Sequence, residues 1–337
     1  NLNATTQWKL GRTSMGVEFR NEGVKSNVLG KPMKEPQDVP FEKEGQYLKS
    51  DNRSNISYFL EHNVLLRRFT LSVGVLANYN SALNEGIHFY PGIDASYRIG
   101  DNFRLYGSWN RALRMPTFTD LYYEGKTNKG NPDLKPEESE AFEVGLKYNT
   151  YFLRAHIAGF YRKGKNMIDW VKEKPEDIWE SQNLTKVDNL GFETNLSLLP
   201  RELGNKRFFI RKIELGYAFI HQDKDSEGYI SNYALDYLKH KFTAQLSHSI
   251  WKGFSATWYV RWQDRAGSYT KYENLKPAYE EPYAPYCLVD MKVNWEYQRL
   301  NLYAELNNLL NSTYYDLGNI PQPGIWFKAG FRYSFKY

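Results

Sequence analysis

Several features of other protein classes are missing from this sequence, and each absence narrows what the protein can be. The chain has 337 residues and one cysteine, Cys287, so no disulfide can form within it. No segment approaches the roughly 20 consecutive apolar residues of a membrane-spanning helix. The opening segment 1–4 leads directly into polar alternation and does not resemble a signal peptide. If this protein sits in a membrane, it does so as a β-barrel.

A clustered basic surface is also missing. The formal net charge is +5, from 44 Lys and Arg against 39 Asp and Glu, and these residues are spread along the chain. Proteins that bind nucleic acids carry their basic residues in a patch or stripe on one face. We therefore expect no nucleic-acid partner.

Recognisable metal and catalytic sites are missing too. The histidines show no metal-ligand spacing; they are His62, His88, His156, His221, His240 and His248. Asp223, Asp225, Glu227 and Gly228 resemble the first half of a calcium loop, but Ala234 stands where the bidentate glutamate belongs. No serine can be matched with a histidine base from its spacing. We expect no catalytic residue, no metal site and no cofactor.

Aromatic residues and strict alternation are abundant instead. Aromatics make up 16% of the chain, with 27 Tyr, 19 Phe and 9 Trp. This density suits a surface that is apolar at one end and wet at the other, as at a membrane interface. Apolar and polar residues alternate with period two, which a helix of period 3.6 does not produce. The clearest alternating segments are 69–75, 142–148, 190–198, 213–219, 254–262, 289–297 and 327–337.

The strands of a soluble β-sandwich would show the same alternation. Further features decide between a sandwich and a membrane β-barrel. The predicted strands are long, about 10 to 16 residues, whereas soluble strands usually have five or six. Aromatic residues stand near the ends of the apolar faces, and the polar faces carry charges from strand to strand, as in a membrane barrel with a wet lumen. We predict an all-β fold, a transmembrane antiparallel β-barrel in the bacterial outer membrane.

The connections between the predicted strands fall into two sets. One set is mostly short, for example 11–12, 100–102 and 252–253. The long set comprises 25–51, 114–136, 222–235, 265–283 and 309–324. Short periplasmic turns and long extracellular loops are typical of outer-membrane barrels. The count is about fifteen strands, and since bacterial single-chain barrels have an even number, we expect strands to be missing before Asn1.

Four motifs occur in an order that resembles a known family. The stretch 114–148 contains Arg114, Pro116, Leu121, Tyr122, the run 130–137, Glu143 and Gly145. The later motifs are 166–171, Asn183 with 191–193, and 306–335. Over about residues 102–337 this arrangement resembles the TonB-dependent outer-membrane receptors, at the place where an extracellular loop returns to a strand.

The resemblance implies a barrel of 22 strands with a plug domain inside it. Residues 1–337 would then be the C-terminal part of the barrel, with the N-terminal plug, its TonB-contacting segment and the first barrel strands absent. The implied function is import of a scarce nutrient with TonB energy, without catalysis. The motifs look most like receptors of the cobalamin type, with ferric-siderophore receptors close behind. A passive porin or another outer-membrane barrel, such as a barrel enzyme, stays open as the alternative.

The loop 114–136 supplies the candidate ligand-binding residues. Pro132 and Pro136 fix φ and restrict the residues before them, so the end of the loop should descend stiffly into the next strand and shape the rim. Binding residues concentrate on loops carried by rigid scaffolds. The candidates are Phe118, Asp120, Tyr122 and Tyr123, with packing against neighbouring loops as the alternative role of the aromatic rings.

Two further sets of residues have expected roles. Lysines and arginines share their strand faces with lumen carboxylates, which predicts a solvated charge network or contact with the plug; these carboxylates are Glu143, Glu193, Asp290 and Glu305. At the end of the chain, Phe335 and Tyr337 resemble the aromatic signal that the outer-membrane assembly machinery recognises. The barrel surface implies outer-membrane lipid as a further partner.

Overall fold

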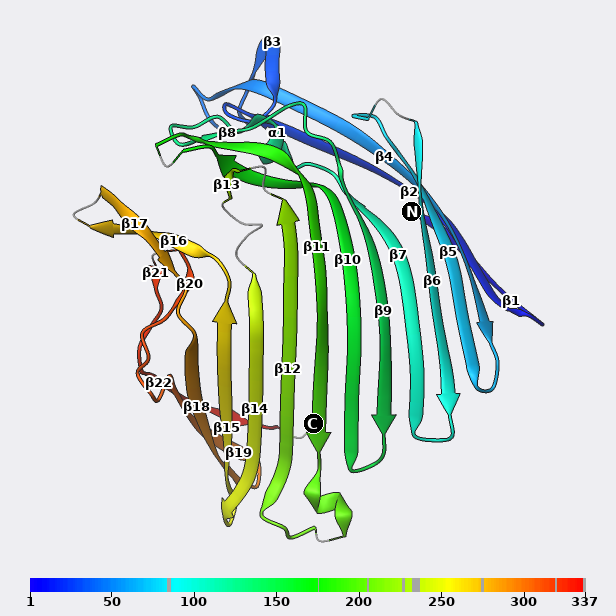
Figure 1. The fold of residues 1–337 in the computed structure, drawn as a ribbon, viewed down its shortest axis with the longest axis vertical. Helices are drawn as coiled ribbons and strands as arrows, with labels where there is room; N and C mark the ends of the chain where they lie inside the picture. Colours follow the sequence, from blue (N-terminus) through cyan, green and yellow to red (C-terminus); the bar gives the residue numbers. More distant parts are fainter. Residues whose placement is uncertain are drawn as a thin grey trace.

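A single curved sheet, in which all the long strands are antiparallel to their neighbours, makes up most of the protein (Figure 1). The computed structural model describes residues 1–83, 86–174, 176–204, 206–225, 228–231, 237–273, 276–318 and 320–335. Within these residues the main sheet has 18 strands, most of them long. The long strands are β1 (Leu2–Trp8), β2 (Gly11–Ser26), β4 (Gln46–Leu65), β5 (Phe69–Asn80), β6 (Ile87–Ile99), β7 (Phe103–Arg114), β9 (Glu137–Asn149), β10 (Leu153–Lys172), β11 (Trp179–Leu198), β12 (Ile210–Asp225), β14 (Leu238–Trp251), β15 (Phe254–Arg265), β18 (Tyr286–Tyr297), β19 (Leu300–Asn307) and β22 (Trp326–Tyr333).

Each long strand pairs with the next long strand along the chain, in the order in which the alternation predicts them. The short connections lie at one end of the wall, and the long connections lie at the other end (Figure 1). This arrangement confirms the predicted strands and the separation of short turns from long loops.

Short elements occupy the long connections and were not predicted from the alternation. They are β3 (Lys31–Asp38), α1 (Phe118–Tyr122), β8 (Asn128–Lys129), β13 (Ile230–Ser231), β16 (Ser268–Glu273), β17 (Lys276–Pro282), β20 (Tyr315–Leu317) and β21 (Ile320–Pro321). A short 3-10 helix, η1 (Pro200–Leu203), lies in the connection between β11 and β12. In the described part of the chain, no helix is long and apolar enough to span a membrane.

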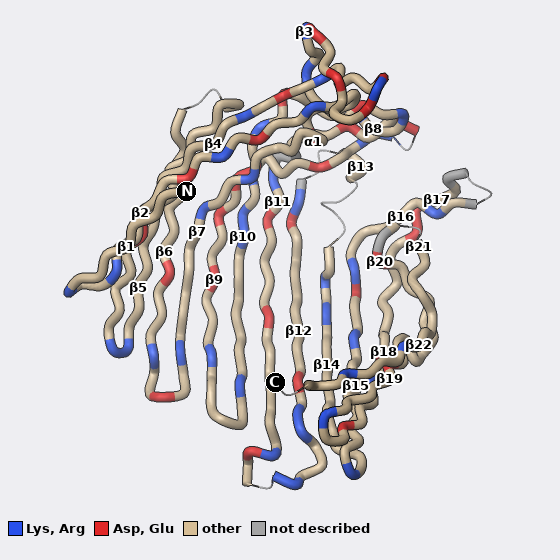
Figure 2. Tube along the Cα trace, turned by 180° about the vertical axis from the view of Figure 1, so that it is seen from behind, with Lys and Arg blue, Asp and Glu red and all other residues tan. Residues whose placement is uncertain are grey.

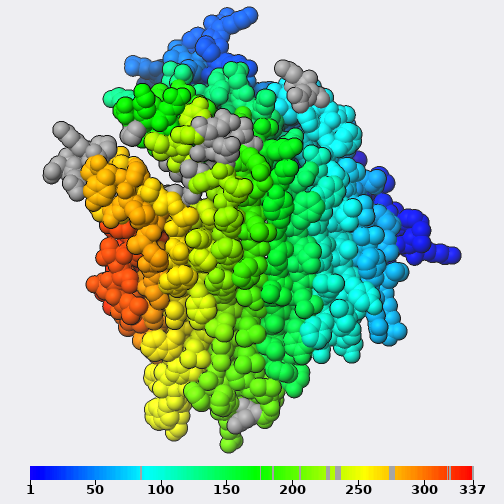
Figure 3. All heavy atoms as spheres, viewed as in Figure 1, coloured from blue at the N-terminus to red at the C-terminus, as the bar shows by residue number. Residues whose placement is uncertain are grey.

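The two faces of the wall differ in polarity, as the alternation predicts. Register places Leu105, Leu146 and Ile157 side by side on the convex face. The large apolar residues exposed on this face include Leu105, Phe142, Val144, Ile157, Leu190, Phe192, Leu215, Phe242, Leu246, Leu302 and Phe331. Figure 3 shows this outer surface as a continuous wall. An exposed apolar face of this extent is the face that a membrane barrel presents to lipid.

The concave face carries the polar side chains. Tyr106 Oη donates a hydrogen bond to Glu143 Oε1 at 2.8 Å and lies 2.7 Å from His156 Nε2. Glu305 forms ion pairs with Lys292 at 2.6 Å and with Lys328 at 2.5 Å. Two of the predicted lumen carboxylates, Glu143 and Glu305, therefore take part in polar contacts on this face.

The sheet has two open edges. In the part of the chain that the structure describes, no strand pairing joins β1 to β22. Figures 1 and 2 show the two strands on opposite sides of the wall. The described strands therefore form a curved portion of a barrel wall.

Candidate ligand-binding loops

The helix α1 owes its position to a capping box directly after Pro116. The Thr117 N–H donates to Asp120 Oδ2 at 2.9 Å, and the Asp120 N–H donates to Thr117 Oγ1 at 3.1 Å. These reciprocal bonds satisfy two backbone donors that a helix start otherwise leaves free. Asp120 is buried, and Arg114 lies 3.6 Å from its carboxylate. The side chain of Asp120 thus begins the helix and faces inward from the loop surface.

Phe118 and Tyr122 pack together against β4. Their rings stack with centroids 6.5 Å apart, and the guanidinium of Arg53 lies 5.0 Å from the centre of the Phe118 ring. Tyr122 Oη donates to Asp51 Oδ2 at 2.5 Å. Burial, together with this hydrogen bond to a carboxylate, raises the pKa of Tyr122 to about 12. Both rings therefore help to fasten the loop to the wall.

Tyr123 is the more accessible of the two adjacent tyrosines. Its ring meets Trp170 of β10 edge to face, with centroids 6.4 Å apart, and the residue is 38% exposed. The structure thus places all four candidates on or beside one short helix. Tyr123 is the most exposed of the four.

The run 130–137 descends into β9 through bonds to β11. The Asn131 N–H donates to Ser181 Oγ at 3.0 Å. Asn183 accepts from the Lys135 N–H at 2.8 Å and donates to the Lys135 carbonyl at 2.9 Å. The rim-shaping role predicted for this run is therefore visible in its contacts, and the motif residue Asn183 acts as its anchor.

A cleft lies between the upper end of β10 and the hairpin of β16 and β17. Its volume is about 410 Å³, and its lining includes Lys172, Trp179, Lys224, Tyr269, Tyr272 and Tyr283. The Tyr269 ring lies 5.1 Å from that of Tyr315 and 5.2 Å from that of Tyr283. Alternation identified 265–283 only as a long loop and missed these residues. Their signal in the sequence is the density of tyrosine and lysine in this segment.

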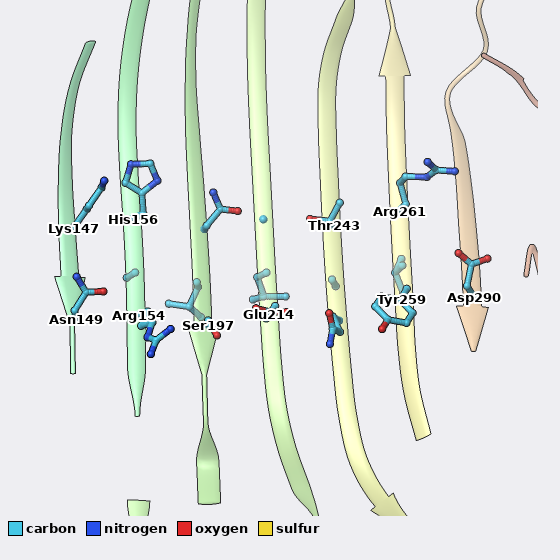
Figure 4. Close-up of a pocket in the computed structure, with 18 residues that line it drawn as sticks. Lys147, Asn149, Arg154, His156, Ser197, Glu214, Thr243, Tyr259, Arg261 and Asp290 are labelled. Carbon is cyan, nitrogen blue, oxygen red and sulfur yellow. The ribbon is translucent and has the colours of Figure 1, made fainter. Parts of the chain in front are cut away.

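A second cavity, of about 650 Å³, opens on the concave face below the loops (Figure 4). Its lining comes from β9, β10, β11, β12, β14, β15 and β18, and Figure 4 shows these side chains along neighbouring strands. The charged residues that line it are Lys147, Arg154, Glu214, Arg261 and Asp290, and His156 stands beside them. Cations outnumber carboxylates in this lining, so the cavity favours polar and anionic groups.

The structure says less about the other predicted sites, because several of their residues lie outside the described ones. Phe335 is exposed and contacts Tyr333, whereas Tyr337 lies outside the described residues. Glu227 and Ala234 of the incomplete calcium pattern also lie outside them. Among the described residues, no group of three or more His, Cys, Asp or Glu side chains is placed to hold a metal ion.

The comparison with protein families covers most of the chain. The family described as TonB dependent receptor-like, beta-barrel matches residues 1–309. This chain belongs to that family. The resemblance carried by the motifs is confirmed, as are the barrel-type fold and the outer-membrane location.

Curated relatives of this family member are transporters and receptors. The chain is 26% identical over 225 residues to the vitamin B12 transporter BtuB of Vibrio vulnificus strain YJ016, covering 50% of this chain and 36% of that protein. It is 22% identical over 297 residues to the ferrienterobactin receptor of Escherichia coli K12, covering 80% of this chain and 38% of that protein. The chain spans about a third of the length of the curated relatives it matches.

Solved structures of the same fold include siderophore receptors. A mutant of the ferric enterobactin receptor PfeA from Pseudomonas aeruginosa aligns with a TM-score of 0.73 at 19% identity, covering 99% of this chain and 53% of that one. The siderophore receptor PirA from Acinetobacter baumannii gives 0.72 at 17% identity, with coverage of 99% and 53%. At these identities the likeness shows the fold alone.

Proposed function

We propose that this chain is part of an outer-membrane active-transport receptor. The receptor binds a scarce nutrient, cobalamin or a ferric siderophore, with its extracellular loops and imports it with TonB energy. Family membership supports this proposal, since the family consists of transport receptors. The observation that carries it is the placement of Tyr123 and the tyrosine-lined cleft at the loop end of a wall with a polar concave face.

The proposal includes no catalytic step. A passive porin or a barrel enzyme was the alternative, and relatives named as transporters and receptors speak against both. Tyr106, Glu143 and His156 form a hydrogen-bonded set on the concave face. We assign them a role in holding the inner surface polar.

Between the two nutrients, the cleft beside β16 favours an anionic chelate. Lys172 and Lys224 line it together with one carboxylate, Glu280, and the rings of Trp179, Tyr269 and Tyr283. An excess of cations beside aromatic rings suits a negatively charged chelate with aromatic catecholate groups, because the rings can stack on those groups and the ammonium groups offset the charge. Iron would be cargo in this case, carried by the chelator.

The proposed partners follow from the same assignment. TonB contact and a plug domain belong to a part of the receptor outside residues 1–337, and the sequence encoded upstream tests this prediction. Phe335 and Tyr337 remain predicted contacts of the outer-membrane assembly machinery. Lipid of the outer membrane is the expected neighbour of the convex face.

Calorimetric titration of the full-length receptor in detergent tests the proposal. Cobalamin and a ferric catecholate siderophore are the two ligands, each also used to compete with the other. Nanomolar binding of either supports uptake, and binding of neither by a receptor with heat-modifiable migration contradicts it. Replacing Lys224 by Gln should lower the affinity for the ferric siderophore by about tenfold. Replacing Lys252 by Gln, in the short turn at the opposite end, is the matched control.

A further inference from the structure

The loop 309–324, between β19 and β22, packs against the cleft although it supplied no candidate binding residue from the sequence. Gly318 of this loop lines the cleft. Figure 1 shows β20 and β21, the two short strands of the loop, beside the hairpin of β16 and β17. The loop and the hairpin therefore form one structural unit at this side of the mouth.

Two contacts tie the aromatic lining of the cleft to this loop. The Gly318 N–H donates a hydrogen bond to Tyr283 Oη at 3.0 Å. The ring of Tyr315 stacks on that of Tyr269, with centroids 5.1 Å apart. Tyr269 and Tyr283 are buried, and their rings contact each other with centroids 5.2 Å apart. The positions of both rings in the cleft thus depend on where the loop lies.

Asp316 fastens the loop to the barrel wall. Its carboxylate Oδ1 accepts a hydrogen bond from Tyr286 Oη of β18. Its backbone carbonyl accepts a second bond from Arg265 Nη1 of β15 at 2.6 Å. Asp316 directly follows Tyr315 and stands two residues before Gly318. The attachment to the wall therefore lies between the two loop residues that hold the rings.

Arg265 connects the same attachment to the cleft by a second route. Its guanidinium lies 5.2 Å from the centre of the Tyr283 ring. Among the described residues that line the cleft, Asp316 is absent, so it acts on a bound ligand through its neighbours. A hydrogen bond from a hydroxyl to a carboxylate is stronger than one between neutral groups. Loss of the Asp316 carboxylate should therefore loosen the loop.

We propose that Asp316 is a positioning residue of the nutrient-binding cleft. By holding the loop against Tyr286 and Arg265, it keeps the rings of Tyr269 and Tyr283 where they can stack on aromatic groups of a ferric catecholate chelate. Rings that are already ordered in the free receptor lose less freedom when the ligand binds. The role in ligand binding rests on the proposed uptake function, whereas the order of the rings is a property of the free receptor.

Nitration of the free, full-length receptor in detergent tests the order of the rings. Tetranitromethane is the reagent, and mass spectrometry identifies the modified tyrosines. In Asp316→Ala, Tyr269 and Tyr283 should be nitrated several-fold faster than in the parent. Tyr122, in a different loop, should react at the parent's rate. Asp316→Asn keeps an acceptor for the Tyr286 hydroxyl and should restore protection.

Calorimetric titration with a ferric catecholate siderophore tests the effect on binding. Asp316→Ala should lower the affinity about tenfold. Tyr286→Phe removes the other partner of the same bond, so the double variant should lose no more than Asp316→Ala alone. The control is Asp101→Ala, which removes an exposed carboxylate in the short turn between β6 and β7 and should bind like the parent.

Unchanged siderophore affinity in Asp316→Ala would overturn the proposal, whatever the nitration rates. Additive losses in the double variant would overturn it too, as would equally faster nitration of Tyr122, which indicates general loosening. A parent that binds neither cobalamin nor the siderophore contradicts the uptake proposal. In that case the nitration rates of Tyr269 and Tyr283 alone decide whether Asp316 positions the rings.

Discussion

Arg53 of β4 lies over Phe118 of α1, with its guanidinium 5.0 Å from the centre of the ring. Its Nη1 donates to the Pro116 carbonyl at 2.6 Å, and its Nε donates to Glu22 Oε2 at 2.7 Å. The residue is only 8% exposed. One buried cation thus joins β2, β4 and the start of the loop that carries the candidate binding residues.

Replacing Arg53 by Gln should release the loop 114–136 from the wall. The change leaves Glu22 and the Pro116 carbonyl without their buried donor, which costs about 1–3 kcal/mol locally. Tryptic cleavage at Lys126 and Lys129 should become several-fold faster in the folded receptor. Arg20→Gln is the control, because Arg20 also pairs with Glu22 but is exposed. Equal protection of the loop in both variants would contradict this role.

The phenol of Tyr122 should lose its proton at a higher pH than an ordinary tyrosine. Its pKa is raised to about 12 by burial and by the bond to Asp51. Because the folded-state pKa is the higher one, the stabilisation is complete below pH 10 and is lost as pH rises from about 10 to about 12. The phenolate absorbance of the parent minus that of Tyr122→Phe isolates this residue. In Asp51→Asn its midpoint should fall below 12 but stay above 10, and an unchanged midpoint would exclude Asp51 as a cause.

The hairpin of β16 and β17 should loosen in acid. The bond from Lys271, at 2.8 Å, lowers the pKa of Glu281 despite the opposing effect of desolvation. A lowered folded-state pKa means that the stabilisation is present above about pH 4.5 and is lost as pH falls through the lower value. Pepsin should therefore cut near Tyr272 faster as pH drops below 4.5. Lys271→Gln should be cut quickly at pH 4.5 already, whereas Lys252→Gln, in the short turn at the opposite end, should be cut like the parent.

Ile157 should tolerate no charge. It faces outward in the middle of the apolar band, so Ile157→Lys should cost about 2–4 kcal/mol on insertion into lipid. Asn195 faces the concave cavity on the adjacent strand, and Asn195→Lys should cost far less. Folding yield into vesicles, followed by heat-modifiable migration of the full-length receptor, compares the two. Similar yields would mean that the assigned faces are wrong.

The strand wall was predictable because its signal is local. Period-two alternation assigns a face to each residue from its immediate neighbours, and every predicted long strand is present. The loop contacts carry no such signal. Tyr122 and Asp51 are 71 residues apart, and only the folded wall shows that the phenol meets that carboxylate. The family motif includes Asn183, but the sequence does not show what this residue does. Its hydrogen bonds to the Lys135 backbone give it a structural role.

The candidate residues were predicted as a group, and the structure separates them by orientation. Asp120 and Thr117 bond to each other in the capping box. The sequence contains this pattern, but period-two alternation does not predict it. Tyr122 and Tyr123 are adjacent in sequence, yet one is bonded to β4 and the other meets β10. Tyr122 is the last residue of α1 and Tyr123 is its extended C-cap, so the two rings point in different directions and sequence proximity alone did not assign their partners. Their contact with a nutrient stays a prediction.

The open edges of the sheet have a consequence for handling the protein. The outer side of β1 and the far side of β22 present backbone donors and acceptors that no described strand satisfies. Such edges are templates for strand addition between copies. Produced alone, residues 1–337 should therefore assemble into polydisperse species through main-chain pairing, and strand-mimicking peptides should reduce their size.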